Sequence, residues 1–237
     1  MRGAGKSYKA PSGKIITWSE LVLLMELEEN KTIEWTDSEV TFNSGFKSHV
    51  YFRGRNDLTD NPRLLQLVGE VLAERVEQLP CTHGRRKCMI GIPTAGTPLA
   101  QVISDLSANS RSSLIGFRLM RSILKEHGKD NMWVGKPELD KHTYITIENV
   151  VSTAKAMFQN FERLEQDGYP THEMFHVIFA SWNLGGFDKL KAQGYEKIVV
   201  LYQMLDIIAA YVHLERWPQE RYDKMARRIN AWRNSAE

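Results

Sequence analysis

Residues 144–157, YITIENVVSTAKAM, combine side chains suited to a phosphorylated sugar with the pattern of a strand, a turn and a helix. β-Branched and apolar residues lead to Glu148, then a Ser–Thr pair precedes helix-forming residues. Hydroxyls and the free N–H groups at a helix start bind phosphate, and a carboxylate accepts hydrogen bonds from sugar hydroxyls. A loop that cradles phosphate usually contains glycine, whereas this turn has Ala154 and Lys155. The stretch is therefore a working phosphate site, a re-tuned one or a relic.

Two further loops have residue types that suit an anionic ligand. Residues 94–96, Thr-Ala-Gly, are small enough for successive backbone N–H groups to converge on an anion. Residues 121–136 form a long polar segment that could close over such a ligand, with basic side chains at Arg121, Lys125 and His127. Taken singly, a Thr-Ala-Gly segment merely turns the chain and a basic loop is solvated. Together, the three loops predict a polyanionic ligand that contains a sugar.

The elements around these loops alternate between strand and helix. This alternation predicts an α/β fold with a mostly parallel central sheet and helices on both faces. Ligands of such sheets bind at the carboxyl ends of the strands, where all three loops would arrive. The expected strands lie within 39–55 (two strands with a turn at Ser44–Gly45), 87–92, 112–120, 143–151 and 172–182, and the expected helices within 19–29, 61–79, 98–108, 152–168, 186–194 and 218–237; residues 196–214 are expected to start as a strand and become a helix.

The length of 237 residues suits one domain with small additions. Residues 1–13 are rich in Gly, Ser, Lys and Pro and are expected to be a flexible tail. The remaining residues, 14–237, are expected to form a single domain. Within it we expect an N-terminal hood at 14–58, a core at 59–214 and a C-terminal helix at 215–237.

Composition narrows the class of protein. The net charge of +2 gives no electrostatic case for a nucleic-acid partner. No apolar run approaches the ~20 residues that span a bilayer, and no signal peptide is recognised, so we expect no membrane association and a cytoplasmic location. Gly5-Lys6-Ser7 resembles the end of a P-loop but lacks a preceding strand. Cys81 and Cys88 lack the paired spacing of a zinc site.

Five stretches, in order, resemble orotate phosphoribosyltransferase, a type I phosphoribosyltransferase. The similarity runs from about Val40 to Leu214. The matching stretches are FNSGFKSHVYF (an N-terminal element), GIPTAGTPLA (a pyrophosphate loop), RSILKEHG (a flexible catalytic loop), ITIENVVSTAKA (the signature for 5-phosphoribosyl-1-pyrophosphate, PRPP) and GGFDKLKAQGY (a late segment). The resemblance implies the type I phosphoribosyltransferase fold, with a small N-terminal hood and an extra C-terminal helix.

The resemblance also implies a reaction and a set of site residues. Such enzymes bind PRPP with Mg²⁺ and displace its pyrophosphate with a ring nitrogen of a base, here a pyrimidine-type base such as orotate. It further implies a homodimer in which loop 121–136 reaches the neighbouring subunit's site. The implied catalytic residues are Lys125, His127 and Arg121; the PRPP-binding residues are Thr94, Ala95, Gly96, Glu148, Asn149, Ser152, Thr153, Ala154 and Lys155; the base-binding residues are Ser44, Gly45, Tyr51, Phe52 and Trp182. The metal is carried by PRPP, with no direct protein ligand.

The chain departs from the family's pattern at several functional positions. Asn149 replaces the second acid of the PRPP signature, Ala154 the phosphate-turn glycine and Ser122 a basic loop residue. Trp182 and Asn43 replace the cations that meet the base, and Trp182 could stack on a base or lie in the core. Three hypotheses follow: an orotate phosphoribosyltransferase, a phosphoribosyltransferase for a less acidic base, and a catalytically weakened protein that senses PRPP or a nucleotide or mediates interactions. Other chemistry on the same fold also stays open.

Overall fold

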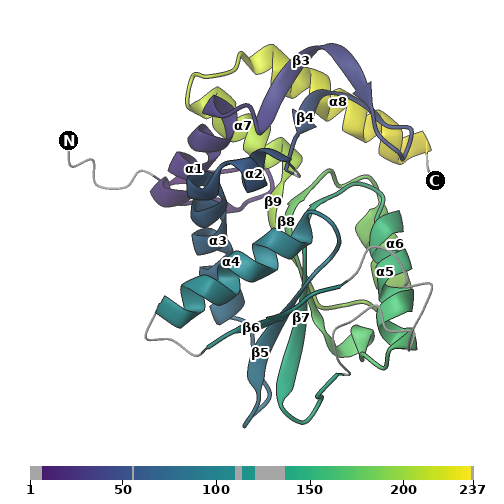
Figure 1. The fold of residues 1–237 in the computed structure, drawn as a ribbon. Coiled ribbons are helices and arrows are strands. Elements are labelled where there is room, and N and C mark those ends of the chain that lie inside the picture. Colours follow the sequence, from purple (N-terminus) through teal and green to yellow (C-terminus); the bar gives the residue numbers. More distant parts are fainter. Residues whose placement is uncertain (1–6, 55, 110–113, 121–136, 236–237) are drawn as a thin grey trace.

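The computed structural model describes residues 7–54, 56–109, 114–120 and 137–235 (Figure 1). None of the described helices is long and apolar enough to cross a membrane. The strands are β1 (Tyr8–Lys9), β2 (Ile15–Ile16), β3 (Ile33–Thr41), β4 (Lys47–Phe52), β5 (Arg86–Gly91), β6 (Gly116–Arg118), β7 (His142–Val151), β8 (Phe175–Ser181) and β9 (Ile198–Gln203). The helices are α1 (Trp18–Glu29), α2 (Asn56–Asp60), α3 (Pro62–Glu77), α4 (Gly96–Asn109), α5 (Lys155–Gln166), the 3₁₀ turn η1 (Thr171–Glu173), α6 (Gly186–Ala192), α7 (Met204–His213) and α8 (Gln219–Ser235).

A five-stranded parallel sheet forms the centre, in the order β6-β5-β7-β8-β9. This confirms the predicted α/β fold. The chain leaves β5 toward β6 on one side and then returns to β7 on the other, so the strand order reverses between β5 and β7. Gly91 at the end of β5 is paired with Ile147 of β7. The crevice at such a reversal is where open α/β sheets bind ligands.

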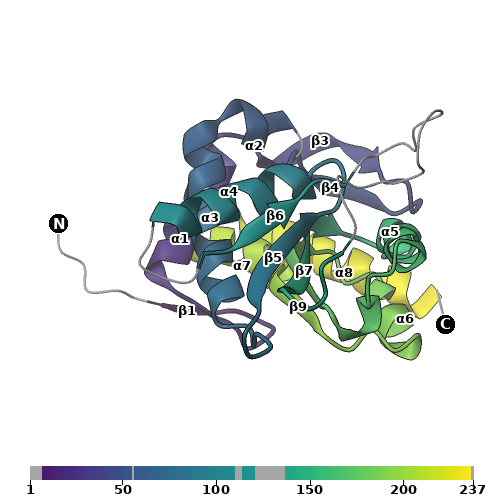
Figure 2. The same ribbon diagram turned by 60° about the horizontal axis from the view of Figure 1, so that its bottom comes forward.

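Helices cover both faces of this sheet, as the sequence predicted (Figures 1 and 2). Alternate strand residues belong to two separate hydrophobic cores because successive side chains point to opposite faces. Met89 and Ile145 pack in the core that includes α1, α3, α4 and α7. Ile90 and Tyr144 pack in the other core, with α5 and α6. Burial on both faces explains why these strands read as nearly continuous apolar runs.

Local sequence signals set the starts of α1 and α3. Thr17 caps α1, and Glu20 completes a capping box by accepting from the backbone N–H of Thr17 at 2.8 Å. Asn61 caps α3, and Pro62 occupies its first turn, where a missing N–H costs no helical hydrogen bond. Both helices lie where the apolar periodicity predicted them.

Residues 8–13, expected to belong to a flexible tail, are instead structured. Tyr8 and Lys9 pair with β2 in an antiparallel ladder. The backbone N–H of Ser12 donates to Asp206 at 3.0 Å, and its hydroxyl donates to the same carboxylate at 2.6 Å. The small polar residues that suggested a tail thus form a turn held to α7 by a carboxylate far away in the sequence.

The β3–β4 hairpin lies beyond the carboxyl ends of the central strands and is covered by α8 (Figure 1). The predicted turn at Ser44–Gly45 is confirmed: Gly45 has φ +85°, and its N–H donates to Phe42 O at 2.8 Å. The hairpin begins earlier than expected, since β3 starts at Ile33. The hairpin caps the carboxyl ends of β5 and β7, the two strands between which the strand order reverses.

Candidate active site

A cavity of about 660 Å³ lies between the carboxyl ends of β5 and β7 and the β3–β4 hairpin. Three parts of the chain that are far apart in sequence meet there: the hairpin, the loop after β5 and the end of β7. The lining residues are Phe42, Asn43, Tyr51, Phe52, Arg53, Gly54, Asp57, Pro93, Thr94, Ala95, Glu148, Asn149, Val150, Ser152, Ala156 and Trp182. The structure therefore brings together two of the three predicted turns, those around Ala95 and Ser152.

The loop after β5 lies directly against β7. The backbone N–H of Ile92 donates to Ile147 O at 2.9 Å, and that of Gly96 donates to Ile92 O at 2.9 Å. A Cβ at Gly96 would lie 2.2 Å from Ile147 O, so only glycine allows this close approach. Thr94 and Ala95 line the cavity, whereas Gly96 serves the contact between α4 and β7.

Glu148 and Asn149 are buried at the end of β7, with 9% and 6% of their surfaces exposed. Glu148 Oε1 accepts from the backbone N–H of Asn149 at 2.9 Å, and Asn149 Oδ1 accepts from that of Val150 at 2.6 Å. A Cβ at Gly54 would lie 2.7 Å from Asn149 Nδ2, so the segment after β4 packs tightly on this amide. A carboxylate and an amide are thus held at the cavity wall, where both could hydrogen-bond sugar hydroxyls.

The turn from Ser152 to Lys155 leads into α5. Ala154 has φ +62°, the left-handed conformation that costs a residue with a Cβ about 1 kcal/mol or more. No side chain caps α5, which leaves its first N–H groups for another acceptor. Ser152 lines the cavity, but Thr153, Ala154 and Lys155 are not among the lining residues, and Lys155 is exposed.

Aromatic side chains line part of the cavity, here called its aromatic end, and Tyr51 and Phe52 of β4 are in its wall. Trp182 follows β8, and its backbone N–H donates to Val151 O at 2.9 Å. Trp182 is 2% exposed, and its ring centroid lies 5.2 Å from that of Phe42. Of the two alternatives for Trp182, its burial favours a core side chain that borders the cavity over a ring free to stack on a base.

Ser44 and Gly45 are absent from the cavity lining, so the structure does not bring these two predicted base-binding residues to the site. The turn carries them toward α8 instead: a Cβ on Gly45 would lie 3.9 Å from Trp232 Cη2. Gly45 lines a separate hollow with Phe46 and Trp232. Phe42 and Asn43, which precede Ser44, line the cavity instead.

Sequence reasoning missed Arg53, Gly54 and Asp57, although Arg53 and Gly54 directly follow the Tyr51–Phe52 pair. Arg53 is the one basic side chain among the described residues that line the cavity. Its Nε donates to Glu34 at 2.7 Å, and this hydrogen bond raises the pKa of the guanidinium. The cation is therefore already paired with a carboxylate.

The predicted catalytic residues Arg121, Lys125 and His127, together with loop 121–136, lie outside the described residues. Within the described part of the chain, no three His, Cys, Asp or Glu side chains form a metal-binding group. Two cavity carboxylates, Asp57 and Glu148, are present. This donor set suits Mg²⁺ held mainly by substrate phosphates, because Mg²⁺ commonly takes only one or two protein carboxylates in such sites.

No family model matches the chain. A search of curated proteins finds orotate phosphoribosyltransferase of Thermosynechococcus vestitus, 25% identical over 174 residues, which are 72% of this chain and 85% of that protein. This match confirms the resemblance seen in the motifs.

Solved structures show the same fold at lower identity. Leishmania donovani UMP synthase matches with a TM-score of 0.70 and 17% identity, over 91% of this chain and 42% of the UMP synthase chain. This chain thus spans less than half the length of that protein. Francisella tularensis orotate phosphoribosyltransferase matches with a TM-score of 0.63 and 14% identity, over 90% of this chain and 98% of that one. The fold is that of type I phosphoribosyltransferases.

Proposed function

We propose that this protein transfers the 5-phosphoribosyl group of PRPP to a pyrimidine-type base, orotate or a related base, and releases pyrophosphate. One observation carries the proposal: a single cavity at the reversal of strand order is bounded by Thr94–Ala95, Glu148–Asn149 and Ser152. The similarity to orotate phosphoribosyltransferases supports the same reaction class. The cavity has the size of a pocket for a small metabolite.

Each wall of the cavity is assigned one part of PRPP. Glu148 and Asn149 hold the ribose hydroxyls through their side-chain oxygens. Ser152 and the free N–H groups at the start of α5, where Ala156 lines the cavity, hold the 5′-phosphate beside the turn from Thr153 to Lys155. Backbone N–H groups near Thr94 and Ala95 hold the pyrophosphate. Mg²⁺, when bound with PRPP, neutralises part of the diphosphate charge.

A ring nitrogen of the base gives up its proton to water and forms a bond to C1 of the ribose. The bond from C1 to the pyrophosphate oxygen breaks, and its electron pair leaves with pyrophosphate. Positive charge develops on the sugar and negative charge on the leaving group, so catalysis consists largely of positioning and charge stabilisation. Glu148, beside the ribose, favours the cationic sugar. Lys125, His127 and Arg121 are assigned to the leaving pyrophosphate from the sequence motif alone.

The aromatic end of the cavity is assigned to the base. Tyr51, Phe52 and Phe42 supply flat apolar walls, and Asn43 supplies an amide donor and acceptor. Arg53, paired with Glu34, is the available cation for an acidic substituent. A base of low acidity suits this wall as well as orotate does, so the test must include both kinds.

A second candidate function is binding of PRPP or a nucleotide without turnover. Asn149 removes one negative charge beside the developing sugar cation, and Ala154 keeps a strained backbone where glycine would relax. A protein selected for binding alone tolerates both changes. This candidate shares the cavity and differs only in the chemical step.

Calorimetry with PRPP and Mg²⁺ tests the binding that both candidates require. Glu148→Gln is expected to weaken binding at least tenfold, because a charge-assisted hydrogen bond contributes roughly 1.5–3 kcal/mol. Glu162→Gln, an exposed carboxylate on α5, is the matched control and should leave binding unchanged. Pyrophosphate release is then measured with orotate, uracil and purine bases. Absence of binding contradicts both candidates, whereas binding without release from any base supports the second.

We also propose a homodimer whose loop 121–136 acts in the partner's site, in a cytoplasmic enzyme. Mixed dimers test the shared loop. Lys125→Ala and Glu148→Ala chains, each inactive alone, should regain about a quarter of wild-type activity when mixed, because a random mixture forms half heterodimers with one intact site each. No recovery, despite subunit exchange seen by light scattering of tagged chains, contradicts the shared loop.

A further inference from the structure

The C-terminal helix α8 contacts the turn of the β3–β4 hairpin through aromatic rings. The Trp232 ring lies edge-on to Phe46, with centroids 5.5 Å apart and an interplanar angle of 88°. Phe46 lies 5.8 Å from Trp182, and Trp182 lies 5.2 Å from Phe42. Phe42 and Trp182 line the cavity. A continuous chain of four rings therefore joins the outer helix to the aromatic end of the cavity.

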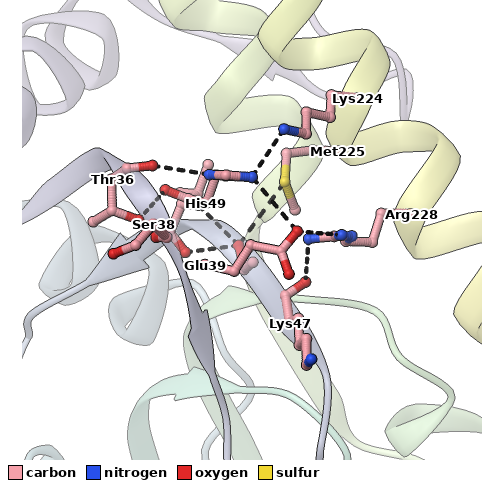
Figure 3. Close-up of polar contacts among 10 residues, drawn as sticks. Thr36, Ser38, Glu39, Lys47, His49, Lys224, Met225 and Arg228 are labelled. Carbon is pink, nitrogen blue, oxygen red and sulfur yellow. Dashed lines mark hydrogen bonds and ion pairs between the residues drawn. The ribbon is translucent and has the colours of Figure 1, made fainter.

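Polar contacts fix α8 against the same hairpin (Figure 3). Arg228 pairs with Glu39 of β3 and donates to Lys47 O of β4 at 3.2 Å. Lys224 Nζ donates to His49 Nε2 at 2.8 Å. Because a lysine ammonium only donates, His49 Nε2 accepts, and His49 Nδ1–H donates to Thr36 O at 2.9 Å. Both strands of the hairpin are thus tied to one face of α8.

The apolar residues of α8 lie on the face that carries Trp232. Met225, Ile229 and Trp232 are separated by four and three residues, which places them on one stripe of a helix. Met225 and Ile229 are fully buried, and Met225 Sδ lies 3.9 Å from Ser48 Oγ. Trp232 sits at the end of this stripe and borders the hollow shared with Gly45 and Phe46. Truncating its ring would leave Phe46 unsupported on that side.

We propose that α8 is a positioning element for the base end of the cavity, and that Trp232 acts through Phe46 on Trp182 and Phe42. This inference rests on the proposed function. It states that α8 affects the affinity of the site for the base and leaves the affinity for PRPP unchanged. The PRPP walls come from the ends of β5 and β7, and the ring contacts of Trp232 run to Phe46 instead. Trp232 is a positioning residue because it is absent from the cavity lining.

The test compares Trp232→Ala with wild type in steady-state kinetics. The KM for the base is expected to rise about tenfold, whereas kcat and the KM for PRPP stay within about twofold. Trp232→Phe keeps an aromatic ring against Phe46 and should restore the KM for the base to within about threefold of wild type. Asn230→Ala, an exposed neighbour on α8, is the matched control and should change neither constant.

Hydrogen–deuterium exchange provides a second measurement that needs no turnover. In Trp232→Ala, amides of residues 42–46 and 182 should exchange at least tenfold faster, while those of residues 92–96 and 148–152 keep their wild-type rates. If wild type releases no pyrophosphate with any base, the proposed function fails and exchange alone decides the role of α8. Equal increases in both Michaelis constants, or unchanged exchange in 42–46, overturn the inference.

Discussion

The two ends of the cavity are built in different ways. At the end assigned to the sugar and phosphates, residues 93–96 follow β5 and residues 148–156 span the end of β7 and the turn into α5; backbone contacts place them, since Ile92 N–H bonds to Ile147 O and Gly96 lies against the same carbonyl. At the base end, side chains from the hairpin, from the end of β8 and indirectly from α8 form the wall. A wall placed by backbone pairing depends mainly on close backbone approach, as at Gly96, whereas a wall made by side-chain packing depends on each ring.

The largest expected effect comes from Trp182→Ala at the base end. Removing a fully buried tryptophan should lower the free energy of unfolding by about 3–5 kcal/mol, measured by urea denaturation. The KM for the base should rise more than tenfold, with the dissociation constant of PRPP within about twofold.

Trp217→Ala is the matched control, since Trp217 is also buried but packs on Tyr211 and Trp35 away from Trp182. It should cost similar stability without the selective loss of base affinity. If Trp182→Ala weakens binding of the base and of PRPP equally, the two ends of the cavity do not differ in the way described.

Gly96→Ala tests the backbone-built end. The new Cβ must move α4 away from Ile147 O, which should cost about 1–3 kcal/mol of unfolding free energy and weaken PRPP binding at least tenfold. Calorimetry and urea denaturation measure the two effects. Gly116→Ala is the control, because its Cβ would meet Cys88 Sγ at an ordinary 3.7 Å. A fully stable Gly96→Ala variant that binds PRPP normally would show that the close approach is dispensable.

Ala154→Gly should sharpen the comparison with a smaller effect. Glycine relaxes the positive φ but gains freedom in the unfolded chain, so stability should change by less than about 1 kcal/mol. Removing the Cβ should lower the dissociation constant of PRPP up to about fivefold. Asn183→Gly relaxes a similar φ of +51° beside Trp182 and should leave PRPP binding unchanged. If Ala154→Gly and Asn183→Gly change the dissociation constant of PRPP equally, relief of backbone strain governs the affinity and the phosphate turn has no special role.

Glu34→Gln gives the smallest expected effect and probes the charge at the base end. Freeing the guanidinium of Arg53 should lower the KM for orotate by up to about fivefold, since exposed ion pairs contribute at most about 1 kcal/mol. The KM for uncharged uracil should stay the same. Glu26→Gln, which loosens a distant pair with Arg63, is the control. An identical response of both bases would remove Arg53 from base recognition.

Much of the architecture followed from short-range patterns. Apolar runs separated by helical periodicity predicted the parallel sheet and its two covered faces, and Ser44–Gly45 marked a turn; in the structure Thr17 and Pro62 lie at the starts of α1 and α3. The tail prediction was wrong for residues 8–13, because a composition rich in small polar residues does not reveal that Asp206 accepts hydrogen bonds from Ser12.

The sequence by itself determined that the loops around Ala95 and Ser152 meet at one cavity, since loops that follow parallel strands emerge at one edge of the sheet; the third predicted loop, 121–136, lies outside the described residues. Only the tertiary structure decided the base end. It buried Trp182, moved Ser44 and Gly45 toward α8, and added Phe42 and Arg53 to the wall. The contacts of Trp182 with Phe42 and of Gly45 with Trp232 join segments more than a hundred residues apart, and no local pattern records such packing.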